Sequence, residues 1–240
     1  MDKVRDKITY KIFHLDSDKE RNKLYSKMQF FLKDKIDELD TPTIKISNQE
    51  DYDMWLSNNP DFYIDGRGAK IPGFEGWRYG EIGIWASNFL AWKKFLDSDC
   101  EYVMLMEDDI IPEDNFMELL ETCMSELPEG WDMFSFFCPD RELPKFDSYH
   151  DIGKDNICKT YQDWSMLCYV LTKDGARKAL ANMSPGIELP LDWYFFRQSH
   201  TFREYTVKPN IKQGCRLAPI ESTFQTKQER NFLNGNIRSN

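Results

Sequence analysis

The stretch EYVMLMEDDIIP, residues 101–112, joins an apolar run to three consecutive carboxylates. Its apolar part predicts a buried strand, and in α/β proteins ligands gather outside the carboxyl ends of the strands. Because side chains alternate along an extended chain, Glu107 and Asp109 are expected to project to one side and Asp108 to the other. Such a pair can hold a hard divalent cation, which prefers oxygen ligands. The stretch therefore predicts a cation site at one edge of a sheet.

A second interpretation of the triplet needs no cation. Acidic residues are favourable at the start of a helix, and NFMELLETCMSEL at 115–127 has helical spacing of its apolar residues. The triplet would then be a solvated acidic turn before that helix. The triplet alone leaves both interpretations open.

Segments typical of strands and helices alternate along the chain. Strands are expected at 8–15, 43–47, 131–137, 163–172 and 202–209, and the apolar run of 101–112 that ends in the acidic triplet is a further strand. Helices are expected at 16–39, 52–56, 81–96, 115–127, 173–183 and 189–199. This alternation predicts one α/β domain with three layers and a mostly parallel central sheet. The chain of 240 residues is of the right length for a single domain.

Composition excludes some classes of partner. The formal net charge of −10 disfavours a broad surface for nucleic acid, which leaves small molecules or glycans. The opening MDKVRDKITYK has no secretory character, and no apolar run is long enough for a membrane span. The cysteines lack metal-ligand spacing. We therefore expect a cytoplasmic protein with reduced thiols. Aromatic residues make up 15% of the chain and serve core packing or, less commonly, sugar stacking.

Three blocks resemble a known family. The block GEIGIWASNFLAWKKFLDSDCEYVMLMEDDIIPEDNF, at 80–116, resembles the core signature of glycosyltransferase family 25, the lipopolysaccharide-biosynthesis and collagen-galactosyltransferase type. FHLDSDKER at 13–21 resembles its opening segment, and LPLDWYFF at 189–196 resembles a later acidic element. Small glycosyltransferases of large algal viruses carry similar blocks, so the resemblance also admits a viral origin.

The resemblance implies a GT-A fold within residues 1–240. The nucleotide-sugar-binding half would span 8–112, the acceptor half 113–226, and a flexible tail 227–240. Glu107 and Asp109 would take the positions of a DxD-like motif. Asp109 would bind Mn²⁺ or Mg²⁺, Glu107 would hold the ribose or a metal-bound water, and Asp108 could serve either role.

The first block implies donor contacts. His14, Leu15, Asp16 and Arg21 would lie near the nucleoside, with Arg21 reaching a phosphate. In the alternative interpretation, these residues form an N-capped helix start, and Arg21 lies on the surface. Gln213 falls where the family often has a polar residue facing the diphosphate.

The last block implies the acceptor chemistry. Family 25 enzymes are taken to invert the anomeric centre, which requires a carboxylate to deprotonate the acceptor hydroxyl. Asp192 is the expected base, with Glu188 in reserve, and Trp193 would stack on the acceptor sugar. A simple N-cap role for Asp192 is the competing explanation. His200 could complete the metal shell, although a lone histidine is more often structural.

One part of the signature departs from the family. Ile84 and Asn88 stand where the family usually has Cys and His, whereas Ser87 is retained. A role that needs an imidazole at that place does not carry over. Gly80 and Gly83 are expected to allow close approach of a neighbouring backbone or a ligand.

The residues and the resemblance together predict a metal-dependent, inverting hexosyl- or pentosyltransferase. It would move a sugar from a UDP-linked donor to a hydroxyl of a glycan or glycoprotein. A Mg²⁺-dependent nucleotidyltransferase that makes nucleotide-sugars is one alternative, but HLDSDKERNK at 14–23 lacks the glycine-rich loop it needs. A non-catalytic carbohydrate-binding descendant is the other, and it would require neither the carboxylate pair nor Asp192.

Overall fold

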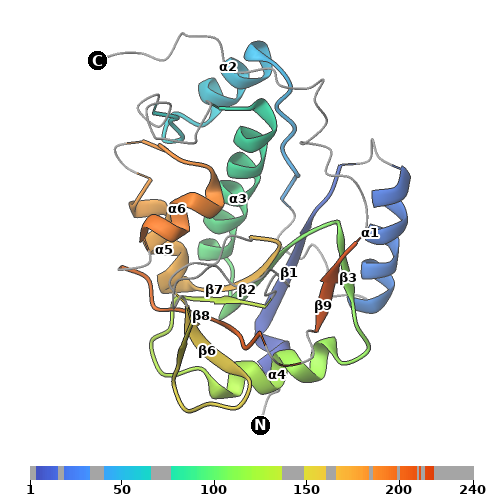
Figure 1. Ribbon diagram of the computed structural model, residues 1–240. Helices are drawn as coiled ribbons and strands as arrows, with labels where there is room; N and C mark the ends of the chain where they lie inside the picture. Colours follow the sequence, from blue (N-terminus) through green and yellow to red (C-terminus); the bar gives the residue numbers. More distant parts are fainter. Residues whose placement is uncertain are drawn as a thin grey trace.

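The computed structural model describes residues 4–15, 19–32, 41–65, 77–136, 149–160, 166–183, 186–198, 201–209, 211 and 214–218. Its helices are η1 (Val4–Lys7), α1 (Lys19–Leu32), α2 (Gln49–Asn58), α3 (Tyr79–Asp97), α4 (Phe116–Glu126), α5 (Lys173–Ala181) and α6 (Leu191–Gln198). Its strands are β1 (Ile8–Phe13), β2 (Tyr102–Glu107), β3 (Ile110–Pro112), β4 (Met133–Ser135), β5 (Tyr149–Asp151), β6 (Ile157–Thr160), β7 (Cys168–Thr172), β8 (Glu204–Val207) and β9 (Cys215–Leu217). Figure 1 shows their arrangement.

The described strands form a seven-stranded sheet in the order β1-β2-β7-β4-β8-β6-β5. β1 pairs in parallel with β2, and β4 with β8, whereas the other neighbours in this order are antiparallel. The prediction of an α/β domain is confirmed, but the mostly parallel pairing is wrong. Parallel neighbours need a crossover, usually a helix, and the described residues between β5 and β7 contain none.

Helices cover both faces of the sheet. On β2, Val103 and Leu105 belong to the core shared with α3, α5 and α6. Met104 and Met106 point the other way, into the core shared with α1 and α4. A strand buried on both faces reads as a continuous apolar run, as it does here. This arrangement gives the three layers that the sequence predicted.

Residues 43–47 were expected to form a strand, and that prediction is wrong. Instead this segment runs along α3, where the Ile44 N–H donates to Ser87 Oγ at 2.8 Å. A Cβ atom on Gly83 would lie 2.8 Å from the Ile44 carbonyl oxygen, closer than such contacts allow. Gly83 therefore permits the close approach that its sequence context suggested. The Ser87 side chain on α3 therefore accepts the Ile44 N–H hydrogen bond that a neighbouring strand would accept in a sheet.

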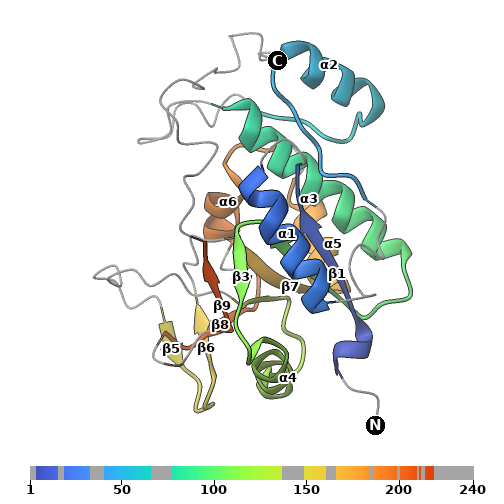
Figure 2. The same ribbon diagram turned by 90° about the vertical axis from the view of Figure 1, so that its right-hand side faces the viewer.

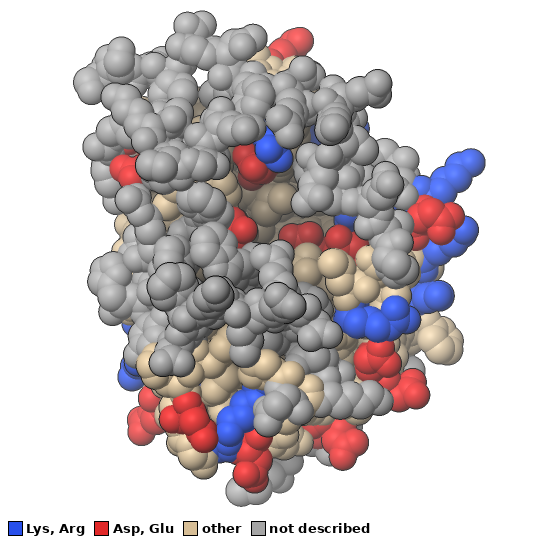
Figure 3. Space-filling view, in the orientation of Figure 1, with Lys and Arg blue, Asp and Glu red and all other residues tan. Residues whose placement is uncertain are grey.

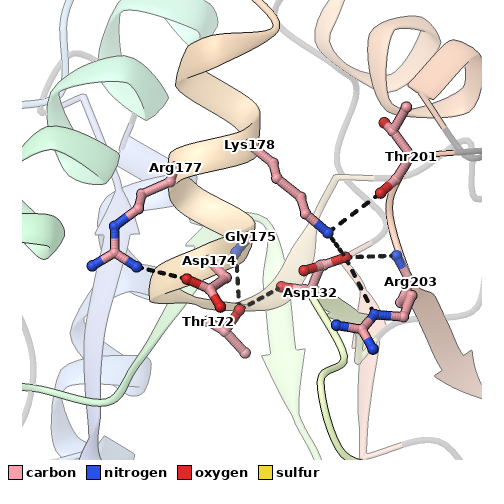
Figure 4. A network of polar contacts seen from close by, with 8 residues as sticks. All are labelled: Asp132, Thr172, Asp174, Gly175, Arg177, Lys178, Thr201 and Arg203. Carbon is pink, nitrogen blue, oxygen red and sulfur yellow. Dashed lines mark hydrogen bonds and ion pairs between the residues drawn. The ribbon is translucent and has the colours of Figure 1, made fainter.

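A buried acid, Asp132, joins neighbouring elements at the end of the central strands opposite to the triplet (Figure 4). Asp132, just before β4, accepts hydrogen bonds through Oδ2 from Lys178 Nζ at 2.6 Å and from the Arg203 N–H at 2.8 Å. Its carbonyl oxygen accepts from the Thr172 N–H at 3.1 Å. Thr172 pairs with Tyr102 at the start of β2, so this network is far along the strand from Glu107. It anchors α5 and β8 to the sheet.

Within the described residues, no helix is both long and apolar enough to cross a membrane. The predicted flexible tail at 227–240 lies outside the described residues.

Candidate functional site

The acidic triplet forms the corner between β2 and β3. β2 ends at Glu107, Asp108 and Asp109 make a turn, and β3 begins at Ile110. β3 pairs antiparallel with β9 as a short ribbon beside α1 (Figure 2). The expected extended chain through the triplet is therefore wrong, because Asp108 and Asp109 form a turn between β2 and β3.

The Asp108 carboxylate binds other side chains of the protein. Its side chain is buried, with 3% of the residue's surface exposed. Oδ2 lies 2.6 Å from His14 Nδ1, and Oδ1 accepts a hydrogen bond from Arg21. The His14 ring stacks on Tyr25 with 4.3 Å between the centroids. Both carboxylate oxygens of Asp108 thus have partners, His14 just after β1 and Arg21 on α1, so we assign it a structural part in the turn.

Arg21 connects α1 to the turn. It also donates to Asp109 Oδ2 at 3.2 Å, so one guanidinium group contacts two carboxylates. Burial opposes its charge, but Asp108 and Asp109 outweigh burial and raise the pKa of Arg21. The alternative of a surface arginine is wrong, since Arg21 is buried. In the structure the guanidinium holds the acidic turn, and its predicted phosphate contact stays a prediction.

The other two carboxylate groups of the triplet are poorly compensated. Asp109 Oδ1 is buried and has no hydrogen-bond partner in the described part of the chain. Burial raises the pKa of Asp109, and Asp108 raises it further. Burial and the neighbouring Asp109 raise the pKa of Glu107 to about 8. Two buried acids held together in this way favour a cation between them.

The residues fit a divalent ion that binds partly through its substrate. No group of three or more His, Cys, Asp or Glu side chains that could hold a metal occurs among the described residues. Mg²⁺ commonly binds through one or two carboxylates and completes its shell with water and substrate phosphates. Glu107 and Asp109 provide such a pair. His200, the predicted further ligand, lies outside the described residues.

Asp192 approaches the triplet from α6. It lies in the first turn of that helix, close enough to raise the pKa of Glu107 together with the larger effects named above. Burial raises the pKa of Glu81, and Asp192 adds to this effect. Acidic side chains line a hollow in this face of the molecule (Figure 3). The structure therefore brings the expected base and the expected metal ligands to one region.

Glu81 was missed by the sequence analysis. It lies in the first turn of α3 and accepts a hydrogen bond from the Arg78 N–H at 3.0 Å through Oε2. An acid at such a position is usually only a cap, so local sequence gave no sign that the charge of Asp192 acts on it.

Several predicted site residues are only partly placed. Leu15 follows β1 and is half-buried, and Glu188 is half-buried before α6. Asp16, Gln213 and the side chain of Trp193 lie outside the described residues. Their predicted roles stay predictions.

The signature positions that differ from the family serve the core. Asn88 is 2% exposed; Oδ1 accepts from the Tyr169 hydroxyl, and Nδ2 donates to the Ile84 carbonyl at 2.9 Å. Ser87 Oγ donates to the Gly83 carbonyl at 2.8 Å. These side chains satisfy buried polar groups, and no described contact brings Asn88 to the triplet.

Arg21→Ala is expected to destabilise the fold by about 3–5 kcal/mol, because it leaves Asp108 buried without its cation. Urea unfolding measures this change. Arg177→Ala is the matched control, since Arg177 pairs with Asp174 while 61% of its side chain is exposed. The control should cost less than about 1 kcal/mol. Equal losses in both variants would contradict the clamp role of Arg21.

Glu107→Gln is expected to change how stability depends on pH. In the metal-free wild type, the pKa of Glu107 is raised from 4.5 to about 8 on folding. Between these values the folded state binds more protons, so the free energy of unfolding falls as pH rises, by at most about 1.4 kcal/mol per pH unit. The variant should lose the part of this fall that Glu107 contributes, while Asp109, whose pKa burial also raises, keeps a smaller fall of the same sign. Urea unfolding at pH 5 and pH 8 in chelator measures it, and Glu118→Gln, on exposed α4 surface, should behave as wild type.

The fold and the site define an α/β protein with a carboxylate pair where a buried strand turns, faced by an acid from a following helix. Residues 77–195 match the family described as glycosyltransferase family 25 (LPS biosynthesis protein). That segment carries α3, the triplet and Asp192. The chain is therefore related to glycosyltransferase family 25, which confirms the resemblance.

Curated relatives agree with this relationship. A glycosyltransferase 25 family member of Anopheles gambiae is 28% identical over 117 residues, covering 48% of this chain and 19% of its own length. A probable inactive glycosyltransferase 25 family member 3 of Bos taurus is 29% identical over 116 residues, covering 47% and 19%. Procollagen galactosyltransferase 2 of Homo sapiens is 24% identical over 131 residues, covering 52% and 21%. The chain thus spans about a fifth of the length of these relatives.

Among solved structures, the crystal structure of A197 from STIV matches with a TM-score of 0.35 and 14% identity. It covers 57% of this chain and 77% of that chain. A likeness of this size carries no argument about architecture or function.

Proposed function

We propose that the chain is a metal-dependent, inverting glycosyltransferase of GT-A type that uses a UDP-linked sugar. The observation that carries this proposal is the buried, unpartnered Oδ1 of Asp109 beside Glu107, in the described part of the chain. A pair of buried carboxylates that share a single arginine is unfavourable in a protein that only needs to fold. The relationship to glycosyltransferase family 25 supports a transferase that uses such a pair.

Asp109 and Glu107 would hold Mn²⁺ or Mg²⁺. The bound ion would supply positive charge to the diphosphate of the departing nucleotide. Arg21 and His14 hold Asp108, so the turn keeps its shape when the donor binds. Arg21 also occupies Asp109 Oδ2, which leaves Oδ1 to face a ligand.

Asp192 would remove the proton from the acceptor hydroxyl as that oxygen attacks the anomeric carbon. A general base must lie on the side of the sugar opposite the leaving group in an inverting reaction. Asp192 comes from a different element than the triplet, on α6 rather than β2, which supports such a division of roles. The acceptor is proposed to be a glycan or glycoprotein, with Trp193 stacking on its sugar.

A non-catalytic descendant is the second candidate. Family 25 members with names that say inactive, such as those of Bos taurus and Homo sapiens, match as well as the others. A descendant of that kind could bind a nucleotide-sugar without turnover. The two candidates differ in whether the sugar is transferred to an acceptor and UDP is released.

A thermal-shift screen of nucleotide-sugars with and without Mn²⁺ tests the proposal. A ligand at about 100 times its Kd adds about 2.7 kcal/mol to stability, which should raise the Tm by roughly 5–10 °C for a chain of this size. The shift should need both Mn²⁺ and a UDP-sugar. Assay of UDP release with glycan acceptors then separates an enzyme from a binding protein. No shift with any donor would contradict the proposal.

A further inference from the structure

The segment that leads into α6 lies outside the seven-stranded sheet. Ile187 forms an isolated parallel bridge with Ile64. Its N–H donates to the Tyr63 carbonyl at 2.7 Å, and its own carbonyl accepts from the Asp65 N–H at 2.8 Å. α6 has eight residues, and a helix of that length is marginal without tertiary packing. The position of Asp192 therefore depends on contacts made by its neighbours in the chain.

Trp85 contacts the chain on both sides of Asp192. Its indole Nε1–H donates to the Leu189 carbonyl at 2.8 Å, three residues before Asp192. Its ring lies 4.8 Å from the Tyr194 ring, two residues after Asp192, with the planes at 77°. The Tyr194 hydroxyl donates in turn to the Ala179 carbonyl on α5 at 2.8 Å.

Burial makes these contacts effective. Trp85 is fully buried, and Leu189 and Tyr194 are also buried. An indole ring has one hydrogen-bond donor, its N–H group. Removing this donor from Trp85 would leave the Leu189 carbonyl without this partner in a site closed to water. Trp85 lies on α3, a helix of 19 residues packed on the sheet. The contacts therefore join the short helix α6 to a long helix that is packed on the sheet.

We infer that Trp85 is a positioning residue for the carboxylate of Asp192. It touches neither donor nor acceptor; it sets where α6 begins and therefore where the carboxylate stands relative to the triplet. This inference rests on the proposed function, in which Asp192 is the base. A small displacement of a base from its acceptor hydroxyl lowers turnover strongly and donor binding little.

Trp92 provides a matched control on the same helix. It is fully buried, and its indole N–H also donates one hydrogen bond, to the Tyr169 hydroxyl at 3.2 Å. Tyr169 belongs to β7. Each ring also packs edge-to-face on an aromatic ring of α6, Trp85 on Tyr194 and Trp92 on Phe195. Replacing either tryptophan with phenylalanine keeps an aromatic ring there and removes one buried indole donor. Only the change at Trp85 removes a hydrogen bond to the segment before Asp192.

The test compares Trp85→Phe and Trp92→Phe in the full chain. In Trp85→Phe, kcat should fall about 10-fold or more, while KM for the donor and the Mn²⁺-dependent donor Kd stay within about twofold of wild type. Amide hydrogen exchange should quicken in residues 187–195. In Trp92→Phe, kcat should stay within about twofold of wild type, and exchange at 187–195 should quicken less than in Trp85→Phe, because the aromatic contact with Phe195 remains. Equal effects in the two variants, or wild-type kcat in Trp85→Phe, would overturn the inference.

Failure of the inference and failure of the proposed function look different. If Asp192→Asn keeps wild-type turnover, the role of Asp192 as base is wrong, whatever Trp85→Phe does. If Asp192→Asn is impaired but Trp85→Phe is not, the inference alone is wrong. Hydrogen exchange needs no turnover, so unchanged exchange at 187–195 in Trp85→Phe overturns the inference even when no donor reacts.

Discussion

Asp109→Ala is expected to abolish Mn²⁺-dependent binding of the nucleotide-sugar and, with it, turnover. The variant removes Oδ1, the buried oxygen that has no hydrogen-bond partner among the described residues. Glu107 alone then faces the ion, and a hard cation with one protein ligand binds weakly. Isothermal calorimetry with Mn²⁺ and UDP-sugar should show no heat above dilution, and UDP release should fall to background.

The fold should survive this change. Asp108 keeps His14 and Arg21 as partners, and removal of Asp109 relieves repulsion on Glu107, whose pKa burial and Asp109 raise. The urea midpoint should therefore not fall. Asp114→Ala is the control, since Asp114 is exposed at the turn before α4, and it should bind donor as wild type does. Wild-type donor affinity in Asp109→Ala would remove the cation site from the account.

Asp192→Asn should lower kcat by at least about 10²-fold while donor affinity stays near wild type. The amide has nearly the shape of the carboxylate but cannot accept the proton of the acceptor hydroxyl. The triplet is unchanged, so Mn²⁺ and donor should bind normally. Steady-state kinetics with donor titration, together with calorimetry, separates these two effects.

Asp174→Asn is the control for this variant. Asp174 also lies in the first turn of a helix, α5, but 76% of its side chain is exposed. If helix-start charge were the only contribution of Asp192, both variants would lose similar stability and neither would lose turnover. Equal kcat in wild type and Asp192→Asn would leave Asp192 as a helix-start acid only.

The main elements were predictable because their signals are local. α3 was expected at 81–96 and spans Tyr79–Asp97, since its apolar residues recur at helical spacing. β2 was expected from a continuous apolar run, and the structure buries that run on both faces. The aromatic excess was expected to serve core packing, and fully buried Trp77, Trp85 and Trp92 bear this out.

The rest depends on contacts between residues far apart in the chain. β3 is three residues long and pairs with β9 about a hundred residues later, and no local pattern announces such a partner. One interpretation made Arg21 a surface residue at the start of a helix. In the structure, α1 holds Arg21 against Asp108, a residue 87 positions away in the sequence. The segment 43–47 has strand composition, but the Ser87 hydroxyl on α3 takes up one of its backbone groups.

The most direct test of the central claim is a crystal structure with Mn²⁺ and a UDP-sugar, in which anomalous scattering locates the metal. The account predicts one manganese peak within coordination distance of Asp109 Oδ1 and a Glu107 oxygen, with the diphosphate on its far side. A manganese ion bound elsewhere, with these two carboxylates turned to solvent, would contradict it.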